Sequence, residues 1–304
     1  MTSPAPLQGK VAVVTGATGG MGQVIARELA RSGAHVVAVV RDPRRADALR
    51  AQIAQQAGAG RLEVITGDLS QREDLIDSTS AITAEHEAIH ILINNAGAHF
   101  HTHRLSPDGL EMHIAVDYLP AYGMTSLLSG ALRRGKARVV NVASDTIRDT
   151  RPVKLLGRPR PATIDPSDLD DLTRLNKTET FVPFEAYARA KLLTVIASYD
   201  QAKTLGIDGV TVNAVHPGIV ATGIINDLIP PILRPIGPLI RRPMLTPERG
   251  AAAALRLATD ESLIGITGRY FLRDIDVPTP AISYDVAVQK RLRDGSNRFL
   301  ASTH

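Results

Sequence analysis

Tyr187 and Lys191 form the residue pair with the clearest chemical potential, four positions apart in AYARAKLL (186–193). In a helix, this spacing places the phenol and the ammonium on one face, where they interact. A tyrosine with its ordinary pKa of about 10 is a poor acid–base group at neutral pH, and a nearby ammonium favours the phenolate. The pair therefore indicates general acid–base chemistry, although the spacing alone arises by chance in many proteins.

A glycine-rich loop, TGATGGMG (15–22), follows the first apolar strand and opens the first helix. Gly16 permits a tight turn, Gly20 allows close approach to a pyrophosphate, and Gly22 lets the helix pack on the strand. The amino end of the helix offers N–H groups to phosphates. The alternative is a glycine-rich turn without a ligand, but the strand–loop–helix context favours a dinucleotide site.

Basic residues follow the second apolar strand in VVRDPRR (39–45). A site selective for NAD places an acid at this strand end, whereas Arg41, followed by Arg44 and Arg45, would pair with a 2′-phosphate. Asp42 comes one position later than the acid of an NAD site. The sequence therefore predicts NADP(H) in preference to NAD(H).

Short apolar runs alternate with amphipathic segments from residue 11 to about 270. The runs lack polar alternation, which is typical of parallel strands covered on both faces. We therefore predict one α/β domain over 1–304, with a doubly wound, mostly parallel seven-stranded sheet and helices on both faces. The predicted strands are 11–15, 35–40, 62–66, 90–94, 137–143, 209–215 and 269–272. The predicted helices include 20–32, 43–56, 70–87, 107–134, 184–205 and 246–258.

Two segments, 145–183 and 222–245, interrupt this alternation. Long excursions at the carboxyl ends of strands are where such folds build substrate pockets. The second segment is apolar and rich in proline and arginine, so it cannot form one uninterrupted helix. We expect a substrate lid there in preference to a membrane-surface patch.

The composition is that of an ordinary soluble globular protein, with 44% hydrophobic and 22% charged residues. There are no cysteines, which excludes disulfides and thiolate metal sites. The net charge of +4 is dispersed and aromatic residues make up 4%, so nucleic-acid binding is disfavoured. Neither a secretion signal nor an apolar run of membrane-spanning length is evident, and we expect a cytoplasmic protein.

Further motifs occur together with the glycine loop, in a specific order. They are GDLS (67–70), NNAG (94–97), VVNVAS (139–144), YARAK (187–191) and HPGIVAT (216–222). In this order the chain resembles the short-chain dehydrogenases/reductases. TPERGA (246–251), TGRYF (267–271) and the segment 281–301 are similar to the retinol dehydrogenase-like branch of that family.

The resemblance implies a hydride transfer between a nicotinamide cofactor and an alcohol or carbonyl compound. In reduction, Tyr187 protonates the carbonyl oxygen and Ser144 donates a hydrogen bond to the same oxygen. Lys191 tunes Tyr187 and orients the nicotinamide ribose. The implied cofactor-binding residues are Gly16, Thr18, Gly20, Met21, Gly22, Arg41, Asp68, Leu69, Asn95, Ala96, Gly97, Tyr187, Lys191, Pro217, Gly218, Val220 and Thr222.

Asp117 departs from the family pattern, because it stands where the family usually has the asparagine of a water-linked proton relay. An aspartate there also holds water, but its charge could pair with Lys191. We include Asp117 among the predicted catalytic residues. Pro120, three residues later, is expected to kink the same helix.

The segment between Ser144 and Tyr187 is longer than is usual in the family, and the additional piece is roughly 147–163. Its five basic residues are Arg148, Arg151, Lys154, Arg158 and Arg160. They favour an acidic or phenolic substrate. A solvated loop without a substrate role is an equally good interpretation.

Three histidines, His99, His101 and His103, occupy alternate positions after NNAG. No fourth metal ligand is evident, so substrate contact is a better interpretation than a metal site, and a plain polar loop is better than either. We predict no metal. Tyr118 and Tyr122 have no lysine four residues later and are expected to be packing residues.

The sequence thus predicts an NADP(H)-dependent reductase of a ketone or aldehyde on a bulky, largely apolar molecule, such as a polycyclic or aromatic secondary metabolite. Oxidation of a retinol-like or other hydrophobic alcohol is the competing enzymatic hypothesis. A non-catalytic NADP(H)-binding sensor is a hypothesis of another class, and it is disfavoured because Ser144, Tyr187 and Lys191 are all present. The family resemblance allows a homodimer or a homotetramer.

Overall fold

One eight-stranded sheet organises the protein, in the order β3-β2-β1-β4-β5-β6-β7-β8. The computed structural model describes residues 6–55, 60–151, 158–220 and 244–302. The strands are β1 (Val11–Thr15), β2 (His35–Val40), β3 (Leu62–Thr66), β4 (Ile91–Asn94), β5 (Arg138–Val142), β6 (Thr211–His216), β7 (Tyr270–Leu272) and β8 (Ile275–Asp276). The seven predicted strands are confirmed, and all their pairings are parallel. β8 adds two residues antiparallel to β7, too short a segment for the sequence to signal.

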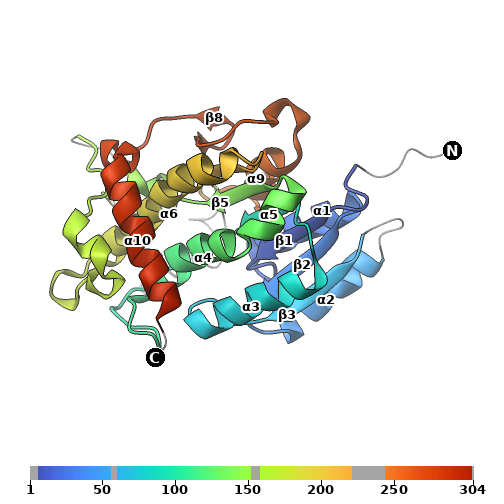
Figure 1. The fold of residues 1–304 in the computed structure, drawn as a ribbon, viewed down its shortest axis with the longest axis horizontal. Helices are drawn as coiled ribbons and strands as arrows, with labels where there is room; N and C mark the ends of the chain where they lie inside the picture. Colours follow the sequence, from blue (N-terminus) through green and yellow to red (C-terminus); the bar gives the residue numbers. More distant parts are fainter. Residues whose placement is uncertain (1–5, 56–59, 152–157, 221–243, 303–304) are drawn as a thin grey trace.

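Helices cover both faces of this sheet (Figure 1). They are α1 (Gly20–Arg31), α2 (Arg44–Ala54), α3 (Arg72–Glu85), α4 (Leu119–Leu127), α5 (Ser129–Gly135), α6 (Pro183–Gly206), α9 (Pro247–Thr259) and α10 (Val286–Ala301). Thr246 caps α9, since its Oγ1 accepts a hydrogen bond from the Arg249 N–H at 3.4 Å. None of the helices in the described ranges is long and apolar enough to cross a bilayer.

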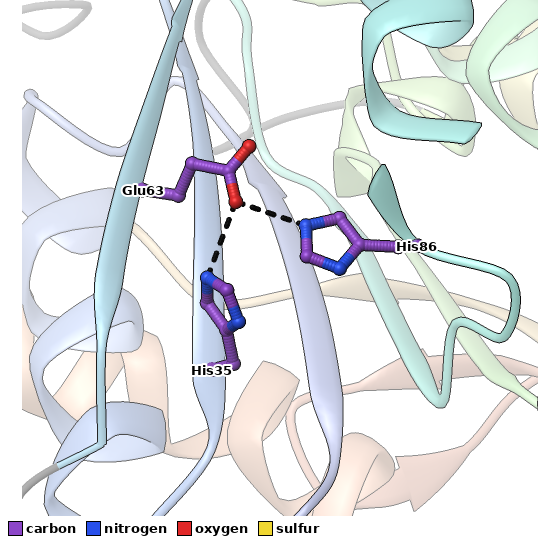
Figure 2. A group of neighbouring side chains, drawn as sticks. All are labelled: His35, Glu63 and His86. Atoms are coloured by element: carbon purple, nitrogen blue, oxygen red, sulfur yellow. Dashed lines mark hydrogen bonds and ion pairs between the residues drawn. The ribbon is translucent and has the colours of Figure 1, made fainter. Parts of the chain in front are cut away.

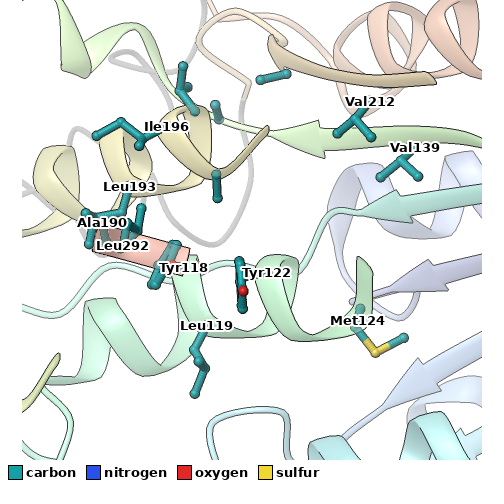
Figure 3. Close-up of a cluster of buried hydrophobic side chains, with 14 of the residues drawn as sticks. Tyr118, Leu119, Tyr122, Met124, Val139, Ala190, Leu193, Ile196, Val212 and Leu292 are labelled. Atoms are coloured by element: carbon teal, nitrogen blue, oxygen red, sulfur yellow. The ribbon is translucent and has the colours of Figure 1, made fainter. Parts of the chain in front are cut away.

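The β-branched strands explain why both faces are covered. In β2, Val37 and Val39 belong to the core beneath α3, α4, α6 and α10, whereas Val36 and Ala38 belong to the core beneath α1, α2 and α9. Alternate side chains point to opposite faces, so an all-apolar strand needs a helical layer on each side. Figure 3 shows part of the first core, where Tyr118 and Tyr122 lie beside Leu193 and Leu292.

The predicted helix 107–134 is wrong in its detail. Residues 107–110 form a turn, and the helical segment begins with a π-helical turn, Ile114–Tyr118, which passes into α4 and then α5. Pro120 has no N–H to donate to the preceding turn. The Leu119 N–H instead reaches the Ile114 carbonyl, a π-type hydrogen bond. The expected disturbance by Pro120 therefore takes the form of a π turn, and Asp117 lies within it.

The segment 281–301 forms a short 3₁₀ turn and α10, which packs on α6 and α4. Tyr118 Oη lies 2.5 Å from Ser296 Oγ, and Tyr122 Oη donates to Asn297 Oδ1 at 2.6 Å. Both tyrosines are therefore packing residues that connect α10 to the π turn and α4. Residues 152–157 of the first insertion, and all of the second but Met244 and Leu245, lie outside the described residues.

Candidate active site

The glycine loop leaves no room for side chains at two of its predicted positions. Gly16 has a φ of +66°, and a Cβ added there would lie 3.0 Å from the Ala96 Cα. A Cβ on Gly22 would lie 2.1 Å from the Gly16 carbonyl oxygen. The loop between β1 and α1 is therefore a cradle of bare backbone, with Gly20 and Met21 in the first turn of α1. Thr18 is half-buried beside them. A dinucleotide pyrophosphate requires this kind of surface.

The NNAG segment is hydrogen-bonded to the glycine loop. The Thr15 hydroxyl accepts the N–H groups of Asn95 and Ala96, both at 3.0 Å. The Asn95 amide donates to the carbonyls of Thr15 and Gly16, at 3.1 and 3.3 Å. The two loops therefore form one rigid unit at the carboxyl ends of β1 and β4. Thr15 was not predicted as a site residue, because a threonine at a strand end carries no distinct signal.

Asp117, Lys191 and Gly97 meet where this unit contacts the π turn. Lys191 Nζ lies 3.1 Å from Asp117 Oδ1, and the two side chains are 4% and 0% exposed. Lys191 also donates to the Val142 carbonyl at 3.2 Å, and the Ala98 N–H donates to Asp117 Oδ1 at 3.1 Å. A Cβ at position 97 would lie 2.8 Å from Asp117 Oδ1, so only glycine fits.

Ser144 and Tyr187 lie next to this ion pair. Ser144 follows β5, and Tyr187 lies one turn before Lys191 on α6, with the Lys191 ammonium 5.8 Å from the centre of its ring. Both side chains are buried, and a hydrogen bond joins them. The structure therefore brings the four predicted catalytic residues together.

Burial raises the pKa of Tyr187, the Asp117 charge raises it further, and the hydrogen bond with Ser144 opposes both effects. Burial also raises the pKa of Asp117, although Lys191 counteracts this. Burial and the Asp117 charge therefore oppose the expected lowering of the Tyr187 pKa by Lys191, and that lowering stays a prediction. The Asp117 carboxylate pairs with the Lys191 ammonium, and its negative charge offsets the effect of the ammonium on the phenol.

The three histidines after NNAG differ in burial and in their neighbours. His99 is buried, and its ring centre lies 5.7 Å from that of Tyr187. His101 is exposed, and His103 contacts Phe181 at 5.3 Å. Burial, helped by the His113 and His101 rings, lowers the pKa of His99 to about 4, so this residue is neutral at pH 7.

His113 and Glu111 form a buried pair that the sequence did not reveal. His113 Nδ1 lies 2.9 Å from Glu111 Oε1, and its Nε2 accepts the Phe100 N–H at 3.1 Å. The His113 ring lies 6.0 Å from that of Tyr187. The pair therefore anchors the loop that carries His99 against Tyr187.

The predicted adenosine end of the site is more open. Arg41 is exposed after β2, and it forms no ion pair with another residue of the described ranges. Asp42 pairs with Arg44 at 3.0 Å, which lowers the pKa of Asp42. Arg41 is therefore the first charged side chain after β2 that Asp42 does not bind. The Asp68 carboxylate accepts the Ser70 hydroxyl at 2.8 Å, and Leu69 is buried between them in the chain.

The loop after β6 borders the same edge of the sheet. Pro217 and Val220 are buried, and Gly218 has a φ of +94°, a conformation that favours glycine. Thr222 lies outside the described residues, so its predicted contact with the carboxamide stays a prediction.

Known proteins resemble this chain in sequence and in fold. A family model described as short chain dehydrogenase matches residues 10–154. The chain is 32% identical to polyprenol dehydrogenase of Danio rerio, over 93% of this chain and 84% of that protein. It is 33% identical to retinol dehydrogenase 12 of Bos taurus, over 87% of this chain and 78% of that protein.

The chain belongs to the short-chain dehydrogenase/reductase family, in its retinol dehydrogenase-like branch. It is therefore an oxidoreductase that acts on alcohol or carbonyl groups. Among solved structures, 3-oxoacyl-(acyl-carrier-protein) reductase of Agrobacterium tumefaciens C58, with NADP bound, superimposes with a TM-score of 0.64 and 25% identity. That similarity covers 89% of this chain and 95% of the reductase.

Three of the five basic residues in the additional piece of this family member lie close to acidic residues. Arg148 pairs with Asp145 at 2.6 Å and Arg151 with Asp149 at 2.8 Å. Arg160 lies 3.7 Å from Glu185, Arg158 is exposed, and Lys154 lies outside the described residues. These ion pairs favour the interpretation of 147–163 as a structural loop over a site for an acidic substrate.

Proposed function

We propose that this oxidoreductase uses NADP(H) to reduce a ketone or an aldehyde on a bulky, largely apolar substrate. The observation that carries the proposal is the meeting of Tyr187, Ser144 and Lys191 at the carboxyl edge of the sheet, beside the glycine loop.

The glycine loop and the NNAG segment fit a nicotinamide dinucleotide. The positions where a Cβ would collide with Ala96 or Gly16 leave backbone N–H groups and the amino end of α1 for phosphates. Bound there, the cofactor supplies the hydride for reduction or accepts it in the reverse direction. Arg41 supports NADP(H), because its guanidinium suits a 2′-phosphate and Asp42 is engaged by Arg44.

In the proposed reduction, Tyr187 Oη transfers a proton to the carbonyl oxygen of the substrate. The Tyr187 phenol is protonated at neutral pH and therefore carries the proton that reduction consumes. Ser144 Oγ donates a hydrogen bond to the same oxygen and stabilises its developing charge. Asp117 holds the Lys191 ammonium in place, and Lys191 positions the nicotinamide ribose.

The relatives support an apolar substrate, since one of them is named for polyprenol and others for retinol. Phe100 and Phe181 contact the histidines that surround Tyr187, which gives this side of the site an aromatic wall. The same names favour oxidation of a hydrophobic alcohol as the second candidate function.

NADPH absorbance measured with a panel of bulky ketones, quinones and aldehydes tests the proposal, and NADP⁺ with the corresponding alcohols tests the reverse direction. Tyr187→Phe should reduce turnover by at least about 10²- to 10⁴-fold while NADPH still binds, because it removes the proton donor. Tyr284→Phe is the matched control, since Tyr284 is half-exposed beside Tyr199, away from Tyr187.

Substantial activity in Tyr187→Phe would contradict the assigned role. Tight NADPH binding without turnover of any carbonyl or alcohol in the panel would support the sensor hypothesis. Faster turnover of alcohols than of carbonyl compounds at neutral pH would support the second candidate.

A further inference from the structure

The side chains of His35, Glu63 and His86 converge at the amino ends of β2 and β3. This is the end of the sheet opposite to the glycine loop. His35 begins β2, Glu63 is the second residue of β3, and His86 directly follows α3. Figure 2 shows both imidazole rings directed at the carboxylate of Glu63. Three separate elements of the fold therefore contribute one side chain each to one point.

The convergence is close. His86 Nε2 lies 2.9 Å and His35 Nε2 lies 3.2 Å from the same oxygen, Glu63 Oε2. The two rings are 4.9 Å apart and almost perpendicular, at 89°. In the described part of the chain, this is the one group of three such side chains whose ligand atoms all lie within 4.8 Å of one another.

These distances come near to those of a coordination site. Ligand atoms of a tetrahedral zinc ion, with bonds of 2.0–2.1 Å, lie about 3.3 Å apart. The two contacts to Glu63 need to lengthen by only a few tenths of an ångström, and the two nitrogens need to approach each other. Side-chain motions of this size are available, because His35 and Glu63 are 29% and 30% exposed.

The donor set suits a transition-metal ion. Two imidazoles and one glutamate are the protein ligands of several zinc enzymes, where water fills the remaining position. His86 is 9% exposed and forms the buried side of the cluster. His35 and Glu63 are partly exposed, so water reaches the other side of the cluster.

One neighbouring charge opposes binding. Burial lowers the pKa of His35 and Arg61 is near enough to lower it further, so a dication in the cluster meets one nearby positive charge and one carboxylate. We therefore expect moderate affinity and not that of a buried structural zinc site.

We propose that His35, Glu63 and His86 bind one divalent transition-metal ion of the zinc class, with water completing the coordination. This departs from the prediction of no metal, which considered only the loop histidines. The site is remote from the reaction, since His35 and Arg41 stand at opposite ends of β2, roughly 20 Å apart at 3.3 Å per residue. A bound ion would tie the edge strand β3 and the end of α3 to β2.

Zn²⁺ titration of the untagged, metal-stripped protein against a chromogenic chelator tests the proposal. We expect one equivalent bound with a Kd of about 10 μM or tighter at neutral pH. Co²⁺ in place of Zn²⁺ should give visible absorption bands of a four- or five-coordinate ion. Zn²⁺ should also raise the Tm, because it binds the folded chain.

His86→Gln should weaken Zn²⁺ binding by at least about 100-fold, since loss of even an outer-shell partner costs 10–100-fold. His101→Gln is the matched control, because it removes an exposed histidine outside the cluster and should bind as the parent does. Glu63→Gln, which preserves shape, replaces His86→Gln if circular dichroism shows that the latter is unfolded.

The proposal is overturned if the parent binds no Zn²⁺ more tightly than about 1 mM. It is also overturned if His86→Gln and Glu63→Gln bind as the parent does, or if His101→Gln alone loses binding. The cluster would then be a hydrogen-bonded group only, or the ion would lie on the loop histidines.

Discussion

The Lys191 ammonium lies 3.1 Å from the Asp117 carboxylate, and both groups are almost completely buried. The family usually has a neutral asparagine at position 117, so this member places a compensated ion pair beside its reactive tyrosine. The Asp117 charge contributes to raising the pKa of Tyr187. At neutral pH the phenol therefore carries the proton that reduction consumes, whereas oxidation needs the phenolate.

Asp117→Asn should lower the pKa of Tyr187, because the charge that opposes the phenolate is removed. Oxidation of an alcohol needs the phenolate as base, so its kcat/KM should begin to rise at a lower pH than in the parent. A pH–rate profile from about pH 6 to 10 measures this shift. Asp208→Asn removes an exposed carboxylate that pairs with Arg133 and should leave the profile unchanged. An unmoved profile in Asp117→Asn would contradict the electrostatic role of Asp117.

Lys191→Met should lower the free energy of unfolding by about 3–5 kcal/mol at neutral pH, because it leaves a buried carboxylate without its cation. Burial raises the Asp117 pKa, so the folded state binds this proton more tightly than the unfolded state does. The loss should therefore be small below the ordinary pKa of 3.8 and grow as the pH rises through the folded value. Urea unfolding at about pH 4 and pH 7.5 measures it.

The double variant Lys191→Met/Asp117→Asn serves as the control for this loss. It removes both charges and should recover much of the stability at neutral pH. An equal loss at both pH values, or a double variant less stable than Lys191→Met, would show that packing and not charge explains the effect.

Gly97→Ala should reduce kcat by at least roughly tenfold, because a misplaced catalytic group is costly. The new methyl would lie 2.8 Å from Asp117 Oδ1 and 3.3 Å from Lys191 Nζ, so the pair must move. Gly130→Ala on α5 is the matched control, since its Cβ would meet nothing nearer than Arg134 Nη1 at 3.6 Å. Unchanged kinetics in Gly97→Ala would mean that the pair adjusts without effect on the reaction.

Arg41→Asp should reduce the preference for NADPH over NADH by about 10- to 100-fold, as expected for the loss of a charge-assisted hydrogen bond worth 1.5–3 kcal/mol. The ratio of the kcat/KM values for the two cofactors measures it. Arg44→Ala is the comparison, because Arg44 is already bound to Asp42 and should matter less. An unchanged ratio in Arg41→Asp would leave the NADP(H) assignment without support.

The strands and most helices were predictable, because each is a local pattern. β1, β2 and β3 begin and end at the predicted residues, since their apolar runs are bounded by polar residues and glycine. The prediction of one helix over 107–134 was wrong in its detail. The form that the disturbance by Pro120 takes depends on neighbouring residues in the fold, which the local sequence pattern does not reveal. The π turn packs against α6, a contact that the local pattern does not contain.

The same difference between local patterns and contacts made in the fold decides which site residues were predictable. Tyr187 and Lys191 share a helix, so their spacing carries the signal. Contacts between distant segments carry none. His113 accepts the Phe100 N–H and Glu111 accepts the Asn176 amide, and neither acceptor was predicted as a site residue. Burial, the largest cause of the raised Tyr187 pKa, depends on the whole fold and likewise leaves no signal in the local spacing.

The packing of α10 on the π turn has a consequence for synthesis. Ser296 holds Tyr118, the immediate neighbour of Asp117, and Asn297 holds Tyr122 one turn later. Residues 286–301 come after every other residue of the site in the chain, so a ribosome has released all of the reactive side chains before their support exists. Until α10 is made, the π turn that carries Asp117 therefore lacks the contact from Ser296.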